Sequence, residues 1–181
     1  MQDRKSAIIS AGLDVLREEG FAGFTQPRIA ARAGLRQSHL TYYFPTRVDL
    51  LAGVARAAIE IQLARIDQML AGAAPDLSAN MARGMVQHEN TRVLMGMAQA
   101  ADHEPALREL FLELTSGILD RAGSLLETLG IPASQTNRDM IHALSVGLAV
   151  IDLATARPDG EERTRAVLDA AFTMMSRQAR T

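Results

Sequence analysis

The residues best suited to chemistry in this sequence lie in one short basic stretch, residues 28–44, which reads RIAARAGLRQSHLTYYF. It holds both tyrosines of the chain, one histidine and three arginines, and no acidic residue occurs between Gly20 and Val48. Guanidinium groups bind phosphates and guanine edges, while amide, hydroxyl and imidazole groups hydrogen-bond to base edges. The stretch therefore carries the side chains that a nucleic-acid-binding surface needs.

Catalytic and metal-binding patterns are weak by comparison. The chain has four scattered histidines and no cysteine, which leaves little for metal or covalent catalysis. Two His-Glu pairs, beginning at His88 and His103, lack the second histidine that a zinc-binding helix carries one turn later. A glycine-rich phosphate loop is also missing. We therefore expect no enzymatic activity, no metal and no cofactor.

Composition predicts an all-α protein. The chain has 181 residues, of which 48% are hydrophobic and only 4% aromatic, and it shows no alternating β-rich runs. No apolar run approaches the ~18 residues that span a bilayer, and no signal peptide follows the first charged residues, so a cytoplasmic location is expected. Residues 1–47 hold seven basic and four acidic residues, a net charge of +3, which leaves −5 for the rest of a chain with a net charge of −2. This asymmetry favours contact between the N-terminal part and a polyanion.

The basic stretch is positioned by three predicted helices at residues 4–19, 26–33 and 37–44. Gly20 is expected to end the first helix, Thr25 to cap the second and Gly34 to supply the turn that follows it. Two short helices joined by a glycine-containing turn are typical of a helix-turn-helix. The outer face of the helix at 37–44 would then present Gln37, Ser38, His39, Thr41 and Tyr42.

A long helix is predicted at residues 46–71, with Thr46 as its cap and Asp49 as the capping partner. Residues 71–78 form a connector, and further helices are predicted at about 76–89, 90–101, 104–129, 133–156 and 161–179, for about nine in total. An alternative to nucleic-acid binding is also open. The adjacent tyrosines could be packing residues and the arginines solvated, so the chain could be a helical interaction module whose N-terminal unit binds protein.

Residues 4–51 resemble the DNA-binding domain of the TetR family of transcriptional regulators. The resemblance rests on GFAGFT, on Ile29, Ala30, Ala33 and Gly34 in the pattern I-A-x-x-A-G, on a short helix that closes on an aromatic pair and Phe, and on PTRVDLL. It implies an all-α fold with an N-terminal three-helix DNA-binding domain (residues 1–47) and a C-terminal helical bundle for ligand binding and dimerisation (residues 48–181). It also implies a ligand-responsive repressor that binds a palindromic operator as a homodimer.

Carried over by position, the resemblance and the exposed polar pattern imply a set of DNA contacts. The predicted DNA-binding residues are Thr25, Arg28, Arg36, Gln37, Ser38, His39, Thr41, Tyr42, Tyr43 and Arg47. Four of them depart from the family pattern. Thr41 stands where many members have tyrosine, Tyr43 replaces a common histidine and Arg47 a common lysine. Arg36 takes the place of a capping serine, so the start of that helix is expected to be frayed or capped differently.

The C-terminal part supplies two further predictions. Methionines adapt to varied apolar ligands, so a small, mostly apolar effector is expected, although plain core packing is the other interpretation of these residues. The ligand-binding candidates are Met85, His88, Arg92, Met95, Met97 and His103. Faces of the last two helices with small residues are expected to form the dimer, with a core face within the chain as the alternative. The dimer candidates are Ala143, Leu144, Gly147, Leu148, Ile151, Leu168, Ala171, Phe172 and Met175.

Overall fold

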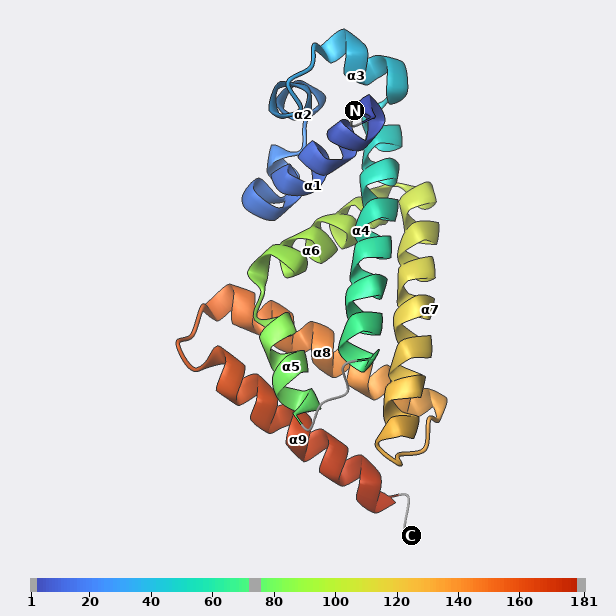
Figure 1. Cartoon of the computed structure of the whole chain (residues 1–181), viewed down its shortest axis with the longest axis vertical. Helices are drawn as coiled ribbons and strands as arrows, with labels where there is room; N and C mark the ends of the chain where they lie inside the picture. Colours follow the sequence, from blue (N-terminus) through green and yellow to red (C-terminus); the bar gives the residue numbers. More distant parts are fainter. Residues whose placement is uncertain (1–2, 72–75, 179–181) are drawn as a thin grey trace. The chain divides into compact units, whose positions relative to one another are not determined.

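The computed structural model describes residues 3–71 and 76–178, and all the regular structure within them is α-helical (Figure 1). This confirms the all-α prediction. The nine helices of the described chain are α1 (Arg4–Gly23), α2 (Gln26–Arg32), α3 (Gln37–Tyr43), α4 (Arg47–Ala71), α5 (Leu77–Met85), α6 (His88–His103), α7 (Pro105–Thr128), α8 (Gln135–Thr155) and α9 (Gly160–Gln178).

The chain divides into two compact units. Unit 1 consists of residues up to 62 together with 92–113, and unit 2 consists of residues 63–91 together with residues from 114 onward. Helices α4, α6 and α7 each supply residues to both units. Unit 1 thus includes, besides the three N-terminal helices, the first part of α4, most of α6 and the start of α7.

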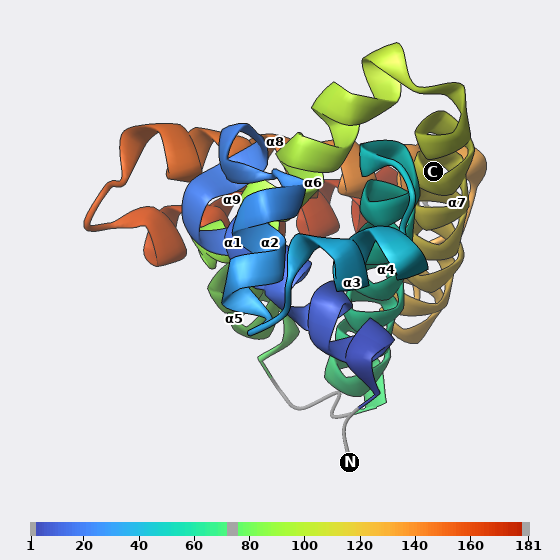
Figure 2. The same ribbon diagram turned by 90° about the horizontal axis from the view of Figure 1, so that it is seen from above.

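The first helix of unit 1 ends as the glycine signal predicts. Gly20 has φ 68° and ψ −166°, a break within the span Arg4–Gly23, and this left-handed conformation costs glycine little. The chain then turns so that Phe24 is fully buried. Helix α2 contacts both α1 and α3 (Figure 2). Fully buried side chains from these helices and α4 form a shared core: Ile8, Val15, Leu16, Phe24, Ile29, Leu40, Leu50 and Val54.

The start of α4 is fixed by a reciprocal cap. The backbone N–H of Thr46 donates to the Asp49 carboxylate at 3.0 Å, and the N–H of Asp49 donates to the Thr46 hydroxyl at 3.0 Å. These bonds satisfy donors that have no partner in the first turn of a helix, and they confirm the predicted cap. The cap places Arg47 at the first position of α4, next to the end of α3.

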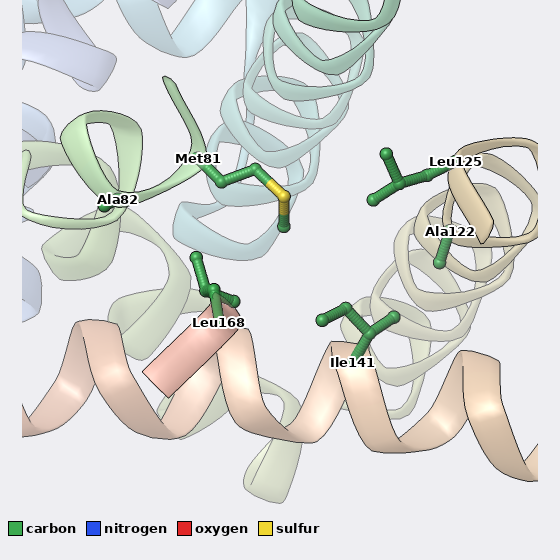
Figure 3. Packing of buried hydrophobic residues seen from close by; sticks show 6 residues of the cluster. All are labelled: Met81, Ala82, Ala122, Leu125, Ile141 and Leu168. Atoms are coloured by element: carbon green, nitrogen blue, oxygen red, sulfur yellow. The ribbon is translucent and has the colours of Figure 1, made fainter. Parts of the chain in front are cut away.

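Four helices supply the core of unit 2. Figure 3 shows six buried side chains converging from α5, α7, α8 and α9. These are Met81, Ala82, Ala122, Leu125, Ile141 and Leu168. A second cluster of Leu126, Ile131, Ala171 and Met175 lies between α7, the loop after it and α9. Three of the predicted dimer residues, Leu168, Ala171 and Met175, therefore belong to the core of the chain itself.

Helix ends in unit 2 follow local signals, with one exception. Gly130 has φ 67°, and the N–H of Ile131 donates to the Leu126 carbonyl at 2.8 Å, which is the bonding pattern of a glycine-terminated helix. The exception is the pair of helices predicted at 76–89 and 90–101. In the structure α5 already ends at Met85 and α6 begins at His88.

Within the described ranges, no helix combines the length and hydropathy of a membrane-spanning segment.

Candidate nucleic-acid interface

Helix α3 presents a polar face on one side and a buried anchor on the other. Leu40 is fully buried in the core of unit 1, whereas Gln37, Ser38 and His39 are exposed. Tyr42 is 80% exposed, and its ring meets that of Tyr43 edge to face with centroids 5.2 Å apart. Tyr42 is thus available for contact with a partner. The face combines amide, hydroxyl, imidazole and phenol groups on one short helix.

The start of α3 lacks a side-chain cap. Arg36 occupies the N-cap position in an extended conformation, and its side chain makes no capping hydrogen bond within the described chain. The departure expected at this position is thus present in the structure. Uncapped N–H groups at a helix start favour an anionic partner. Gly34, with φ 68°, forms the turn between α2 and α3 and so sets the direction in which α3 begins.

Two of the predicted contact residues already bond to the backbone. The Thr41 hydroxyl donates to the carbonyl oxygens of Gln37 and Ser38, each at 3.2 Å. Nε of Arg47 donates to the Phe24 carbonyl at 3.1 Å, and the guanidinium lies 4.7 Å from the centroid of the Phe21 ring. Arg47 therefore has a structural role that the sequence did not reveal. Thr25 is at the N-cap position of α2, but its exposed hydroxyl makes no capping bond in the described chain.

The arginines of α2 are paired with acids of α1. Arg28 Nη1 donates to the Glu19 carboxylate. Arg32 bonds to Glu18 through both terminal nitrogens, with Nη1 2.6 Å from Oε2. Hydrogen bonding from Arg32 holds the pKa of the Glu18 carboxyl below its ordinary value and raises the pKa of Arg32. The basic stretch has no acid near it in sequence, but the fold brings two acids against it.

The six predicted ligand residues fall into both units. In unit 1, Met97 is buried, Met95 and His103 are exposed, and Arg92 Nη1 donates to the Arg17 carbonyl at 3.3 Å. In unit 2, Met85 packs against the core and His88 Nε2 lies 2.8 Å from Oδ2 of the buried Asp152. Arg92 and His88 thus already have partners within the protein.

The predicted dimer residues of α8 and α9 differ in exposure. Leu168, Ala171 and Met175 are buried in unit 2, so the α9 face expected to meet another chain is an internal face. Leu144, Leu148 and Phe172 pack against the core from its edge. Ala143 and Ile151 are exposed, and the space beside the Gly147 Cα is open to 4 Å within the described structure.

Three further apolar residues on these helices are exposed, and Met140 and Met174 among them were not singled out from the sequence. Met140, Val167 and Met174 are 41%, 38% and 58% exposed. Met140 continues the spacing of Ala143, Gly147 and Ile151 along α8, so helical periodicity could have found it. On α9 apolar residues occur on both sides of the helix, and periodicity alone does not separate the inner side from the outer one.

Unit 2 also contains a pocket that the sequence did not predict. It has a volume of about 640 Å³ and combines an apolar wall with charged and hydroxyl groups. Its lining is Leu77, Ser78, Leu129, Ile131, Asp169, Phe172, Thr173, Ser176 and Arg177. Of the residues predicted to bind a ligand or a second subunit, it includes Phe172. Among the residues that the structure describes, no group of three or more His, Asp or Glu side chains could hold a metal ion.

Comparison with known proteins identifies the N-terminal region. Residues 8–54 match the model of bacterial regulatory proteins, tetR family. The HTH-type transcriptional regulator RutR of Escherichia coli K12 is 41% identical over 61 residues, which are 34% of this chain and 29% of RutR. The sequence match therefore covers less than a third of that relative.

Solved structures extend the likeness over the described fold. A TetR-family member from Streptomyces coelicolor A3 is 28% identical, with a TM-score of 0.71 over 94% of this chain and 98% of that one. The multidrug binding protein EbrR complexed with ethidium is also 28% identical, with a TM-score of 0.66 over 93% of this chain and 98% of EbrR.

The match to the family model is therefore confined to the N-terminal region, whereas the likeness in fold extends along nearly the whole chain. The matched family consists of regulatory proteins rather than enzymes. The N-terminal region of this chain, residues 8–54, therefore belongs to the tetR family of bacterial regulatory proteins, and the fold of the whole described chain is similar to that of solved TetR-family members.

Proposed function

We propose that this protein is a transcriptional regulator that binds duplex DNA through α3. The observation that carries the proposal is the exposed polar face of α3 on a buried leucine anchor, within the segment that matches the family model. The second helix of a helix-turn-helix enters the major groove, where each base pair presents a distinct pattern of donors and acceptors. Gln37, Ser38 and His39, in the first turn of α3, are the proposed base-reading residues.

Selection from random duplex DNA tests this function. The purified protein should enrich a defined sequence, and His39→Ala should change the preferred base at one position of each half-site while binding to random duplex persists. If the wild-type protein shows no preference for any duplex over random DNA, the proposal fails. The alternative, in which the N-terminal unit binds protein, would then be favoured.

We also propose that the protein acts as a homodimer on a palindromic operator. The support is a set of surface apolar residues on unit 2, called the stripe below. On α8 they are Met140, Ala143, the half-buried Gly147 and Ile151, and on α9 they are Val167, Ala170 and Met174. Apolar residues repeated along the outer side of a helix are suited to a protein interface. One short helix reads only a few base pairs, so two copies would double the contacts at half-sites one DNA turn apart, roughly 34–36 Å.

Repression relieved by a small effector is the third part of the proposal. A similar protein, EbrR, is described as a multidrug binding protein and has been solved with ethidium. In this chain, the 640 Å³ pocket of unit 2 replaces the methionine set as the proposed effector site, because its lining joins Phe172 and Leu77 to the charged Asp169. An effector that releases DNA must bind less tightly when operator is present. Thermal-shift screening followed by titration with and without operator measures this coupling, and equal affinity in both titrations excludes an effector role.

A further inference from the structure

Two ion pairs join the end of α1 to α2. Arg28 pairs with Glu19 and Arg32 pairs with Glu18, with the partners nine and fourteen residues apart in sequence. The four side chains are one-third to just over one-half exposed, with Glu19 and Arg32 at 34% and Glu18 at 55%. They therefore lie on the surface, where solvent and a polyanion can reach them.

Gly23, the last residue of α1, leaves room for one of these pairs. A Cβ added to Gly23 would lie 2.6 Å from the Glu19 Cβ and 3.3 Å from Arg28 Nη1. Real Cβ atoms do not approach other atoms so closely, so a side chain at this position would push Glu19 away or displace the turn. The backbone is thus compatible with the Glu19–Arg28 contact only because residue 23 has no side chain.

The paired arginines stand on the helix that precedes the proposed recognition helix. In a helix-turn-helix this first helix crosses the DNA backbone, and its basic residues are suited to phosphate contact. Exposed ion pairs contribute little to stability, so a phosphate can replace a carboxylate at modest cost. Hydrogen bonding from Arg32 holds the pKa of Glu18 below its ordinary value, which favours the ionised carboxylate that pairs with the guanidinium.

We propose that Glu18 and Glu19 compete with DNA phosphates for Arg32 and Arg28, and that this competition limits affinity for duplex DNA of any sequence. The inference rests on the proposed DNA-binding function. It assigns these two glutamates an inhibitory role in binding, with no contact to the bases. Gly23 contributes to this competition because it permits the Glu19–Arg28 contact.

Binding to random-sequence duplex at several salt concentrations tests the competition. Glu18→Gln with Glu19→Gln should raise affinity at low salt by about fivefold for each released arginine, the equivalent of one exposed ion pair. The plot of log affinity against log salt should steepen by up to about 0.9 for each arginine that gains a phosphate. Asp102→Asn is the control for each single Glu→Gln substitution, since it also removes one negative charge, at an exposed carboxylate of α6.

A double-mutant cycle separates competition from a general charge effect. If Glu18 acts through Arg32, the gain from Glu18→Gln should vanish in a chain that also carries Arg32→Gln, while circular dichroism confirms that both variants are folded. An unchanged salt slope, or a gain no larger than that of Asp102→Asn, overturns the inference although the wild type binds DNA. If the wild type binds no duplex at all, the proposed function fails and the inference fails with it.

Discussion

At the scale of single residues, Arg47 combines a contact within the protein with a predicted contact to phosphate. Its guanidinium lies against Phe21 and donates to the Phe24 carbonyl. Arg47→Ala should therefore weaken binding to every duplex and also lower the free energy of unfolding by about 1–2 kcal/mol, through loss of the cation–π contact and the hydrogen bond. Chemical denaturation and DNA titration measure the two effects separately.

Arg36→Ala is the matched control for Arg47. Arg36 is exposed and its side chain makes no capping bond in the described chain, so its loss should weaken DNA binding while leaving the denaturation midpoint within experimental error. If Arg47→Ala is as stable as Arg36→Ala, the contacts with Phe21 and Phe24 contribute nothing and only the DNA role remains.

His142 should make unit 2 sensitive to pH. Burial lowers the pKa of its imidazole below the ordinary value of 6.5, although Asp139 acts in the opposite direction. Between the two pKa values the unfolded chain binds a proton that the folded chain does not, so stability rises with pH in this window. The contribution of His142 to the free energy of unfolding should therefore be fully present above about pH 6.5. It should be lost as the pH is lowered from that value toward the shifted pKa.

Replacing His142 by Gln should flatten this dependence. Urea denaturation at a series of pH values from 5 to 7.5 measures the slope for the wild type and the variant. Equal slopes in this range would show that His142 titrates in the folded chain as it does in the unfolded one.

At the scale of elements, close contact between α1 and α4 depends on Gly12. A Cβ at this position would lie 2.6 Å from Val54 Cγ2, and both residues are in the core of unit 1. Gly12→Ala should therefore force the helices apart and cost about 1–3 kcal/mol in spite of the better helix propensity of alanine. Thermal and chemical denaturation give the sign and size of the change.

Gly84 supplies the opposite case on α5. Among the described residues, no atom lies within 4 Å of a Cβ added there. Gly84→Ala should raise stability by about 0.5–1 kcal/mol, since alanine loses less backbone entropy in a helix. If Gly12→Ala raises stability as Gly84→Ala does, propensity rather than packing decides the outcome at Gly12.

At the scale of the whole molecule, the exposed stripe of α8 and α9 predicts how the protein assembles. Ile151→Arg and Met174→Arg place a charge on side chains that are 56% and 58% exposed. Each should convert a dimer to a monomer with little loss of monomer stability, because an unpaired charge is costly in a dry interface but not in water. Sedimentation velocity at micromolar concentration measures the change.

Leu168→Ala is the contrasting core variant for that experiment. Leu168 is fully buried in unit 2, so its truncation should cost about 2–5 kcal/mol in stability, with assembly affected only through unfolding. If the wild-type chain sediments as a monomer at the same concentration, the proposed dimer is wrong. The exposed apolar residues of α8 and α9 would then have to be explained by a different partner.

Local signals explain why much of the fold was predictable. Gly20, Gly34 and Gly130 adopt positive φ at the ends of α1, α2 and α7, and Thr46 with Asp49 caps α4. Each signal acts over a few residues, so the sequence alone determines these boundaries. The polar face of α3 was predictable for the same reason, since helical spacing places its apolar residue, Leu40, inward.

Tertiary structure decided which charges and apolar faces are available. Glu18 lies fourteen residues from Arg32, yet the packing of α1 on α2 brings them together, and no local pattern encodes that distance. On α9, Leu168 is buried while Met174 is exposed, although both are apolar and periodicity treats them alike. The sequence by itself determined the helix ends that Gly20, Gly34, Gly130 and Thr46 mark and which helix carries the polar face, because these depend on neighbouring residues. Only the fold decided which charges are neutralised and which apolar side chains remain exposed, because both depend on residues far apart in the chain.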